Sequence, residues 1–297
     1  MRHIFIVNRI SGQGKALKFV PIIERVAIKY QLDYEILYTE KENDAKIYAQ
    51  KYRDDDIIIY SAGGDGTLFE IVNGINDAST LCVLPLGSGN DFYRLISNEK
   101  NVEKILINSI NGHQTSIDYA LCNDYKWINV TSFGIDAEIN ATASKWIRKR
   151  IFTKGPAYIF SIIKNMVNLK SHHYTIKADG KTLEDDYYIV AILNGRYYGN
   201  GVPACPDASV QDGYLDLCLV PKISIFKVYP LLIKYMSGKH LNDPDFKRIK
   251  AKNIDISCDE IVNYQSDGEN NMTNHLHISI KEKALKMMIP NNSKHIN

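Results

Sequence analysis

The sequence predicts two domains, an α/β domain with a mostly parallel sheet followed by a β-rich antiparallel sandwich. Strand and helix patterns alternate over roughly the first 120 of the 297 residues. From about Thr115 the pattern changes to short strands separated by turn residues, with few helices. A chain of this length can bury two ordinary hydrophobic cores, so we place the domain boundary at residue 121.

The first domain, residues 1–121, is predicted to consist of βαβ units. Short apolar or β-branched runs predict its strands, which lie at Ile4–Val7, Tyr34–Tyr38, Ile57–Tyr60 and Leu81–Leu84. Helical patterns lie between them, at about Ala16–Tyr30, Ala45–Tyr52 and Leu68–Ile75. This alternation favours a parallel sheet with helices on both faces, and ligands of such sheets bind at the carboxyl ends of the strands.

The second domain, residues 122–290, is predicted to be mainly antiparallel. Strand patterns begin just before the boundary and lie at Ser116–Leu121, Trp127–Thr131, Tyr174–Ala178, Tyr187–Leu193, Leu215–Val220, Ile254–Ser257, Leu276–Ile280 and Leu285–Ile289. Two helical segments interrupt them, Tyr158–Leu169 and Ile223–Met236. Asp179-Gly180 is a turn signal between two of the strands. The C-terminal segment, about 285–297, is a candidate to return to the first domain.

The composition excludes several classes of protein. The net charge is only +2 and no aromatic-and-basic RNA-binding motif occurs, so we expect no nucleic-acid partner. The five cysteines form no closely spaced pairs, which fits a reducing compartment better than a disulfide framework or a zinc site. No apolar run approaches the ~20 residues that span a bilayer. We therefore expect a cytoplasmic protein.

A glycine-rich turn is the strongest functional signal. Gly63-Gly64-Asp65-Gly66-Thr67 follows the buried strand pattern and precedes a helical pattern. Glycines let the backbone approach a phosphate closely, and a helix N-terminus adds positive potential. Asp65 has the wrong charge to bind an anion, so it would hold the turn or contact a cation, directly or through water. The pattern indicates a nucleotide with Mg²⁺, although a plain tight turn remains an alternative.

Two more polar, glycine-bearing segments follow predicted strands. They are Asn8-Arg9-Ile10-Ser11-Gly12 and Gly87-Ser88-Gly89-Asn90-Asp91. Because the carboxyl ends of parallel strands meet at one edge of a sheet, all three segments should converge on one crevice.

Further along the chain, Asn194–Gly201, Pro206–Asp216 and Asp267-Gly268-Glu269 complete a set of six motifs. In this order the motifs resemble the catalytic domain of the diacylglycerol kinase and sphingosine kinase superfamily, especially the bacterial soluble diacylglycerol kinases and related lipid kinases. The resemblance covers essentially the whole chain and implies an NAD-kinase-like first domain. It also implies an enzyme that uses ATP and Mg²⁺ to phosphorylate a lipid hydroxyl, with diacylglycerol as the leading acceptor.

The resemblance implies a nucleotide site built from Asn8, Ser11, Gly12, Thr39, Gly63, Gly64, Asp65, Gly66, Thr67, Ser88, Asn90, Asp91 and Arg94. Asp65, Asp91 and Asp118 match three aspartates that hold a Mg²⁺–water network, which suits an ion that dehydrates reluctantly. Two of these residues have simpler alternatives, strand capping for Thr39 and pairing with Asp91 for Arg94. Glu70 is left out as a solvated helix residue.

The resemblance implies that Glu269 is the general base, with Asp267 as its partner or the alternative base. A plain turn is the alternative for this segment, which is rich in turn formers. A second, structural Mg²⁺ is implied at the Asp212 carboxylate and the carbonyls of Ser209 and Tyr214. The chain departs from the family pattern where Arg9 replaces a common proline and Asn200 replaces a glycine, which affects the detail of the phosphate loops.

The segment from Lys145 to Lys170 contains no acidic residue and mixes basic with aromatic side chains. Arg148, Lys149 and Arg150 could dock on an anionic bilayer, and a core-packing helix with a solvated basic face is an equal alternative. We expect a lipid substrate at the membrane surface, transient peripheral membrane contact and, through an exposed sheet edge, a possible homodimer. Two other functions remain open, a soluble-substrate kinase of the NAD-kinase type and a catalytically silent nucleotide or lipid sensor.

Overall fold

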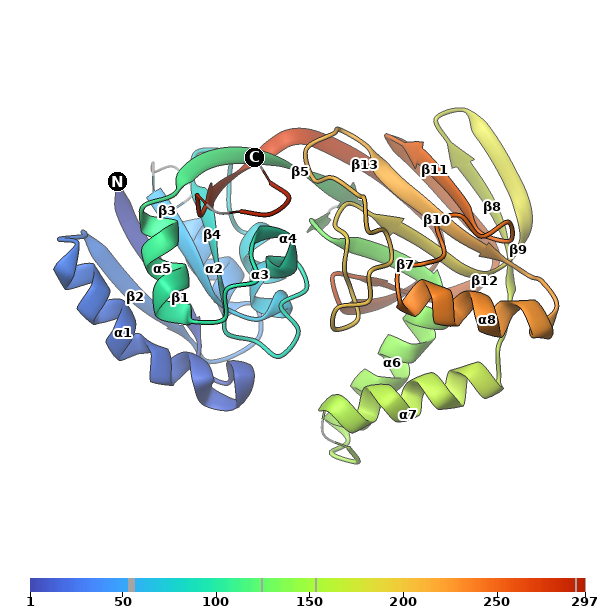
Figure 1. Cartoon of the computed structure of the whole chain (residues 1–297), viewed down its shortest axis with the longest axis horizontal. Coiled ribbons are helices and arrows are strands. Elements are labelled where there is room, and N and C mark those ends of the chain that lie inside the picture. The colour runs from blue at the N-terminus through green and yellow to red at the C-terminus, as the bar shows by residue number, and fades with distance from the viewer. Residues whose placement is uncertain (53–56, 124, 153, 292, 297) are drawn as a thin grey trace.

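The computed structural model describes residues 1–52, 57–123, 125–152, 154–291 and 293–296. The chain forms two lobes, and β5 (His113–Cys122) and β13 (Glu269–Ile289) cross between them (Figure 1). Strands of both lobes belong to one hydrogen-bonded network, with β2 and β11 at the two ends of its main path. Within the described ranges, no helix combines the length and the apolar character that crossing a bilayer requires.

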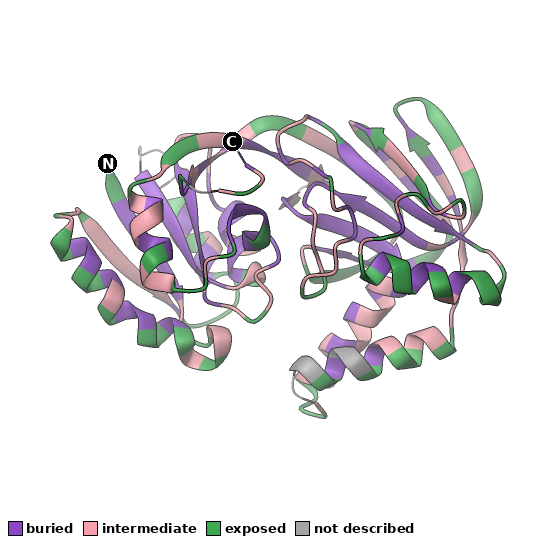
Figure 2. Cartoon of the chain, viewed as in Figure 1, coloured by how far each residue is buried: buried purple, intermediate pink, exposed green. Residues whose placement is uncertain are grey.

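The N-terminal lobe contains the predicted parallel sheet, in the strand order β4-β3-β1-β2. Its strands are β1 (Arg2–Asn8), β2 (Tyr34–Thr39), β3 (Ile57–Gly63) and β4 (Thr80–Pro85). Successive side chains on β1, such as Ile4 and Phe5, are fully buried although they point to opposite faces (Figure 2). Burial on both faces explains why these strands are continuous apolar runs rather than alternating ones.

The helices of this lobe pack in pairs on the sheet, α1 with α5 and α2 with α3. Their bounds are η1 (Ser11–Gly14), α1 (Lys15–Lys29), α2 (Asp44–Lys51), α3 (Asp65–Val72), α4 (Tyr93–Ile96) and α5 (Val102–Ile110). The sequence analysis missed α5. This helix begins after Asn101, whose side chain accepts the backbone N–H of Lys104 at 3.1 Å and so caps the first turn.

The C-terminal lobe is antiparallel, as predicted. Its strands are β6 (Tyr125–Trp127), β7 (Val130–Gly134), β8 (His172–Ala178), β9 (Lys181–Leu193), β10 (Leu215–Pro221), β11 (Lys247–Ala251) and β12 (Asn253–Ser266). The Asp179-Gly180 turn joins β8 to β9. Both predicted helices are present, as α7 (Lys154–Val167) and α8 (Ile225–Met236).

A third helix of this lobe, α6 (Ile135–Arg148), was not predicted. It starts after Gly134, whose φ of 86° suits glycine and whose Cα packs against the backbone of β9. Acidic residues lie in its first turn and basic residues, Lys145 and Arg148, in its last turn, an arrangement that the helix dipole favours.

The two strands predicted at Leu276–Ile280 and Leu285–Ile289 are parts of the single strand β13. The prediction of two separate strands was therefore wrong. A bulge interrupts the pairing with β5 between Lys281 and Leu285, and the exposed bulge hides the continuity of the strand in the sequence. Beyond the bulge, Met287 pairs with Leu81 of β4. The end of β13 therefore lies beside the sheet of the N-terminal lobe.

Candidate functional site

Three polar loops meet at the carboxyl edge of the parallel sheet, where the sequence predicted that they would converge. The Asn8 side chain donates to the Thr67 hydroxyl over 2.9 Å, which joins the end of β1 to the first turn of α3, directly after the glycine turn. The Ser11 hydroxyl donates to the Leu86 carbonyl over 3.3 Å, which joins the first loop to the loop after β4. The loops thus support one another.

Close backbone packing between Gly64 and Gly87 holds two of these loops together. A Cβ on Gly87 would overlap the Cα of Gly64 and lie 2.9 Å from the Asn90 side chain. A Cβ on Gly66, the second residue of α3, would have no neighbour within 4 Å. The glycines of the two loops therefore have different tasks, and Gly87 is required for packing.

We expect Gly87→Ala to destabilise the protein by about 1–3 kcal/mol, because the added methyl must push two backbones apart. The matched change Gly66→Ala should be neutral or slightly stabilising, since the helix gains a better helix former. Urea unfolding of both variants measures the difference. Equal unfolding midpoints for the two variants would contradict this packing role.

Asn90 and Ser88 differ in what they can offer a ligand. Asn90 adopts a φ of 54°, and its side chain accepts the Gly87 N–H at 3.0 Å and donates to the Gly87 carbonyl at 2.9 Å. Ser88 is exposed at the tip of the same loop. Asn90 is therefore engaged in shaping the loop, whereas the Ser88 hydroxyl faces solvent.

Thr39 and Glu70 are placed by their structural contacts. Thr39 is buried at the end of β2, where its backbone pairs with Asn8. Glu70 accepts the backbone N–H of Ala45 at 3.1 Å, at the N-terminus of α2. Glu70 thus joins α3 to α2 rather than being a simple solvated helix residue.

Asp65 and Asp91 form the acidic centre of the site. The Asp65 carboxylate accepts the backbone N–H of Asp91 at 2.9 Å. One oxygen of each carboxylate lies near the Cβ position of Gly89, at 2.8 Å for Asp65 and 3.8 Å for Asp91. Burial raises the pKa of Asp91, although hydrogen bonds from Asn200 and Arg94 oppose that rise. Two hard oxygen donors around one small space fit a hydrated Mg²⁺.

The same acidic centre bridges the two lobes. Asn200, in a loop of the C-terminal lobe, donates its backbone N–H to Asp91 at 2.9 Å. Arg94 contacts Asp91 at 3.3 Å, and its guanidinium carbon would lie 3.1 Å from a Cβ on Gly201. Arg94 therefore pairs with Asp91 at the lobe junction. The sequence analysis missed Asn200 as a contact because its bond comes from the backbone.

Asp118 lies in a different environment from Asp65 and Asp91. It is fully buried, and its carboxylate accepts backbone N–H groups from Gly213 at 2.8 Å and Lys283 at 2.7 Å. Burial raises its pKa, and the charges of Asp212 and Glu282 add to the rise. In the described part of the chain, no group of three metal-binding side chains occurs. Asp118 thus anchors the loop of the second predicted metal position.

That second position, formed by Ser209, Asp212 and Tyr214, already contains a cation from the protein. The Lys250 ammonium pairs with the Asp212 carboxylate. The other oxygen of Asp212 accepts the Tyr214 N–H at 3.1 Å. A Mg²⁺ bound here would have to compete with Lys250 for the carboxylate.

Asp267 holds the turn that carries Glu269. Its carboxylate accepts three backbone N–H groups, from Ile128 at 2.8 Å, Asn129 at 3.1 Å and Val130 at 2.9 Å. Burial raises the pKa of Asp267 to about 7, although the three hydrogen bonds act in the opposite direction, and the nearby Asp65 adds to the rise. With both oxygens engaged, Asp267 is a positioning residue.

Glu269 is the first residue of β13. Its side chain is exposed, yet the surrounding protein removes enough water to raise the pKa of the carboxyl, and the charges of Glu42 and Glu70 raise it further. Both of those residues belong to the N-terminal lobe. Asp65 acts on Asp267 in the same way across the junction. Two hydrogen bonds bring this turn close to the N-terminal lobe, since Asn73, directly after α3, donates to the Lys126 carbonyl at 2.9 Å and Asp267 accepts the N–H of the nearby Ile128 at 2.8 Å.

Two residues that the sequence analysis missed hold the turn of Glu269 from behind. Asn140 of α6 donates to the Gly268 carbonyl at 3.1 Å and to the Asn270 side chain at 2.9 Å. Gln265 accepts the Gly268 N–H at 2.8 Å. Both are buried polar side chains, and nothing in the sequence around them distinguished them from other polar residues.

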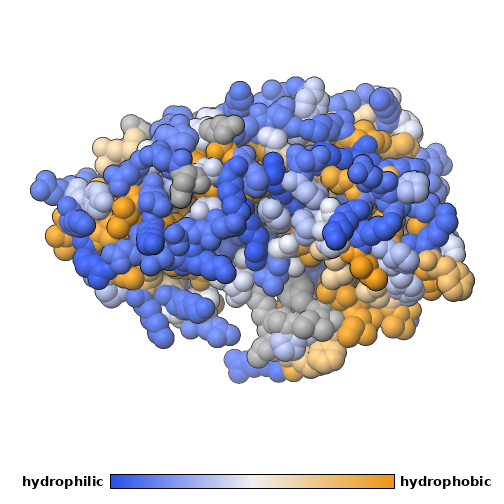
Figure 3. Space-filling model, viewed as in Figure 1, coloured by the Kyte–Doolittle hydropathy of each residue, from blue (hydrophilic) through white to orange (hydrophobic). Residues whose placement is uncertain are grey.

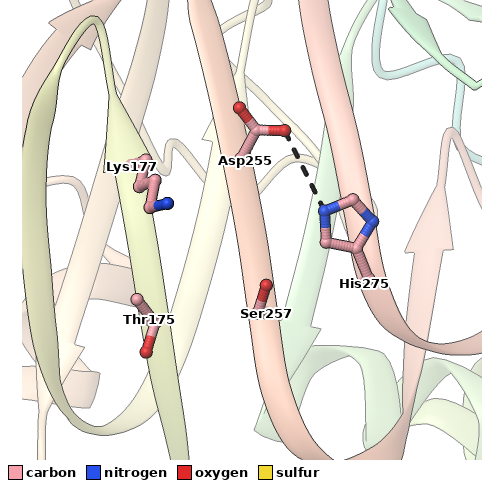
Figure 4. Close-up of a pocket in the computed structure, with 5 residues that line it drawn as sticks. All are labelled: Thr175, Lys177, Asp255, Ser257 and His275. Carbon is pink, nitrogen blue, oxygen red and sulfur yellow. Dashed lines mark ion pairs between the residues drawn. The ribbon is translucent and has the colours of Figure 1, made fainter.

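The structure has one pocket away from these loops and another beside them. One is a polar hollow on the outer face of the C-terminal sheet, where His275 faces Asp255, and it is lined by Thr175, Lys177, Asp255, Ser257 and His275 (Figure 4). None of its residues belongs to the candidate site. The other adjoins the glycine loops and is lined by Lys15, Lys18, Phe19, Ile22, Pro85, Leu86, Gly87, Lys100 and Val102. Its three lysines give the edge of the candidate site a positive potential.

The fold and the site define a two-domain protein that combines the glycine-rich loops of an α/β domain with an acidic turn of an antiparallel β domain. Residues 2–122 match the diacylglycerol kinase catalytic domain, and residues 129–289 match the YegS C-terminal NAD kinase beta sandwich-like domain. The chain therefore belongs to the diacylglycerol kinase-like family of lipid kinases.

Individual relatives agree with this assignment. A diacylglycerol kinase from Staphylococcus carnosus is 26% identical, over 89% of this chain and 87% of its own length. One from Bacillus subtilis is 27% identical, over 78% of this chain and 80% of its own length. A crystal structure of a candidate diacylglycerol kinase from Bacillus anthracis strain Sterne superimposes with a TM-score of 0.79 at 28% identity, over 98% of this chain and 97% of that one. Both predicted domains are thus confirmed as to their fold.

Proposed function

We propose that this protein transfers the γ-phosphate of ATP to the hydroxyl of diacylglycerol, giving phosphatidic acid and ADP. The observation that supports the proposal is the junction of the two lobes, where Asn200 of the C-terminal lobe contacts Asp91 and where carboxylates of the N-terminal lobe act on the turn that carries Glu269. Diacylglycerol is chosen because relatives over most of the chain bear that name. Phosphoryl transfer depends mainly on positioning and on charge stabilisation, and this site provides groups for both.

The N-terminal lobe supplies the nucleotide side of the reaction. Backbone N–H groups near Gly64 and Gly87 would bind phosphate oxygens, and the lysine-lined pocket beside Gly87 adds positive charge. Asp65 and Asp91 would hold Mg²⁺ through water. When bound, Mg²⁺ neutralises the charge of the β- and γ-phosphates.

The C-terminal lobe supplies the base. Glu269 would accept the proton of the lipid hydroxyl while that oxygen forms a bond to phosphorus and the bond from phosphorus to the ADP oxygen breaks. Its raised pKa brings the carboxylate closer to the pH at which it works as a base. Asp267 and Asn140 keep the turn in place.

The experiment is an assay with Mg²⁺ and labelled ATP, run separately with vesicles that contain diacylglycerol and with NAD. We expect label in phosphatidic acid and none in phosphorylated NAD. Label only in phosphorylated NAD would favour the soluble-substrate kinase. ATP binding without label in either acceptor, or in a wider panel of lipid alcohols, would favour the catalytically silent sensor.

A further inference from the structure

Two helices of the C-terminal lobe expose large apolar side chains. We define the apolar ridge as Phe160, Ile163 and Val167 of α7 with Phe226, Ile233 and Met236 of α8, all of which are exposed. Val167 is 75% exposed and Phe226 is 87% exposed. Apolar surface extends over both helices in the lower right of the space-filling view (Figure 3). An exposed apolar surface of this kind is typical of a binding surface.

The ridge is not the core-facing side of these helices. The opposite face of α8 buries Val228, Leu231 and Tyr235 in the core of the lobe. The Tyr229 hydroxyl donates to the Met166 carbonyl at 2.9 Å, which fixes α8 against α7. Each helix therefore has one apolar side that packs against the protein and a second apolar side that is exposed to water. A surface helix of a globular protein usually has a polar outer face instead.

Positive charge adjoins the ridge. No aspartate or glutamate occurs between Glu138 and Asp179, a stretch that covers most of α6 and all of α7. We define the basic collar as Lys145, Arg148, Lys149, Arg150 and Lys164. Within the described ranges, none of these five side chains pairs with a carboxylate. By contrast, Lys227 and Lys234 of α8 pair with Asp245 and Asp243.

A short chain of contacts connects this surface to the candidate base. The Ser161 hydroxyl of α7 donates to the Ile139 carbonyl of α6 at 2.6 Å. The next residue of α6, Asn140, holds the Gly268 carbonyl beside Glu269. A substrate that leaves a bilayer at α7 would thus enter the protein near the turn that carries the base.

We propose that the apolar ridge and the basic collar together dock this protein on an anionic lipid bilayer. The ridge inserts among the acyl chains at the interface, and the collar binds the negatively charged headgroups. The charge complementarity selects an anionic bilayer over a second copy of the chain, which would bring two basic collars together. This inference rests on the proposed function in one respect, because docking would bring the active site to its lipid substrate. The residues that support the docking surface do not depend on that function.

Sedimentation with vesicles of phosphatidylglycerol or of phosphatidylcholine, without nucleotide or diacylglycerol, tests the docking. We expect binding to phosphatidylglycerol vesicles that weakens on the order of 100-fold when Arg148, Lys149 and Arg150 are all changed to Gln. Changing both Phe226 and Ile233 to Ser should weaken it about tenfold or more. Matched controls in the N-terminal lobe are Ile28→Ser, an exposed apolar site, and the combined change of Lys29, Lys51 and Lys104 to Gln.

Activity on a water-soluble, short-chain diacylglycerol separates the two proposals. The surface variants should phosphorylate it like the wild type, because the ridge and collar lie outside the reacting groups. Binding of the surface variants equal to that of the controls would overturn the docking proposal. The docking proposal would also be overturned if equilibrium sedimentation showed that the wild type is a dimer and that the variants of the apolar ridge are monomers. Vesicle binding that follows the prediction in a protein with no kinase activity would overturn only the proposed function.

Discussion

Changing Glu269 to Gln is expected to lower the turnover of diacylglycerol on the order of 10²-fold or more, the contribution of a general base. The amide keeps the size of the side chain but cannot accept the hydroxyl proton. ATP should still bind, because the nucleotide loops belong to the other lobe. The matched control is Glu24→Gln on α1, an exposed carboxyl remote from the site, which should leave turnover unchanged.

The pH profile gives this prediction a second readout. A general base works only when it is deprotonated, so turnover should fall as the pH decreases through the pKa of Glu269. Burial and the charges of Glu42 and Glu70 raise that pKa, so the fall should begin at a higher pH than for an ordinary glutamate. The acidic limb should change in Glu269→Gln, because the contribution of Glu269 to it is lost, whereas any contribution of Asp267 remains. Turnover near the wild-type level, or an unchanged acidic limb, would rule out this role for Glu269.

Changing Asp65 to Asn is expected to lower turnover on the order of 10²-fold or more, since it removes one of two carboxylates that would hold Mg²⁺ against the phosphates. An asparagine can still accept the backbone N–H of Asp91, so the loop should keep its shape. Stability should therefore change little, and the Mg²⁺ concentration needed for half-maximal activity should rise. Activity titrated with Mg²⁺, together with thermal unfolding, measures both effects.

The control for this variant is Asp33→Asn, an exposed aspartate at the opposite end of the parallel sheet. It removes the same charge and should leave the Mg²⁺ titration unchanged. A wild-type Mg²⁺ titration for Asp65→Asn would show that the Asp65 carboxylate takes no part in binding the metal. A large loss of stability would instead assign Asp65 to the loop structure alone.

Local sequence patterns were sufficient for most of the secondary structure. The β1 and β3 strands are continuous apolar runs that are buried on both faces. Such runs are typical of a parallel sheet covered by helices, so the sequence predicted this arrangement. The α6 helix was missed because Asn140, Thr142 and Ser144 interrupt its apolar residues and are weak helix formers, and packing against α7 stabilises it. The single strand β13 was predicted as two strands because exposed lysines at its bulge interrupt the apolar pattern.

The sequence by itself determined the order of the glycine loops, the identity of the acidic residues and the family that the chain resembles. These features depend only on residue type and spacing. Only the tertiary structure decided that Asp267 positions the turn, that Asp118 anchors the Asp212 loop and that Asn140 supports Glu269. These roles depend on partners far away in the chain. A carboxylate becomes a base, a metal ligand or a structural acceptor according to the groups around it, and folding sets those groups.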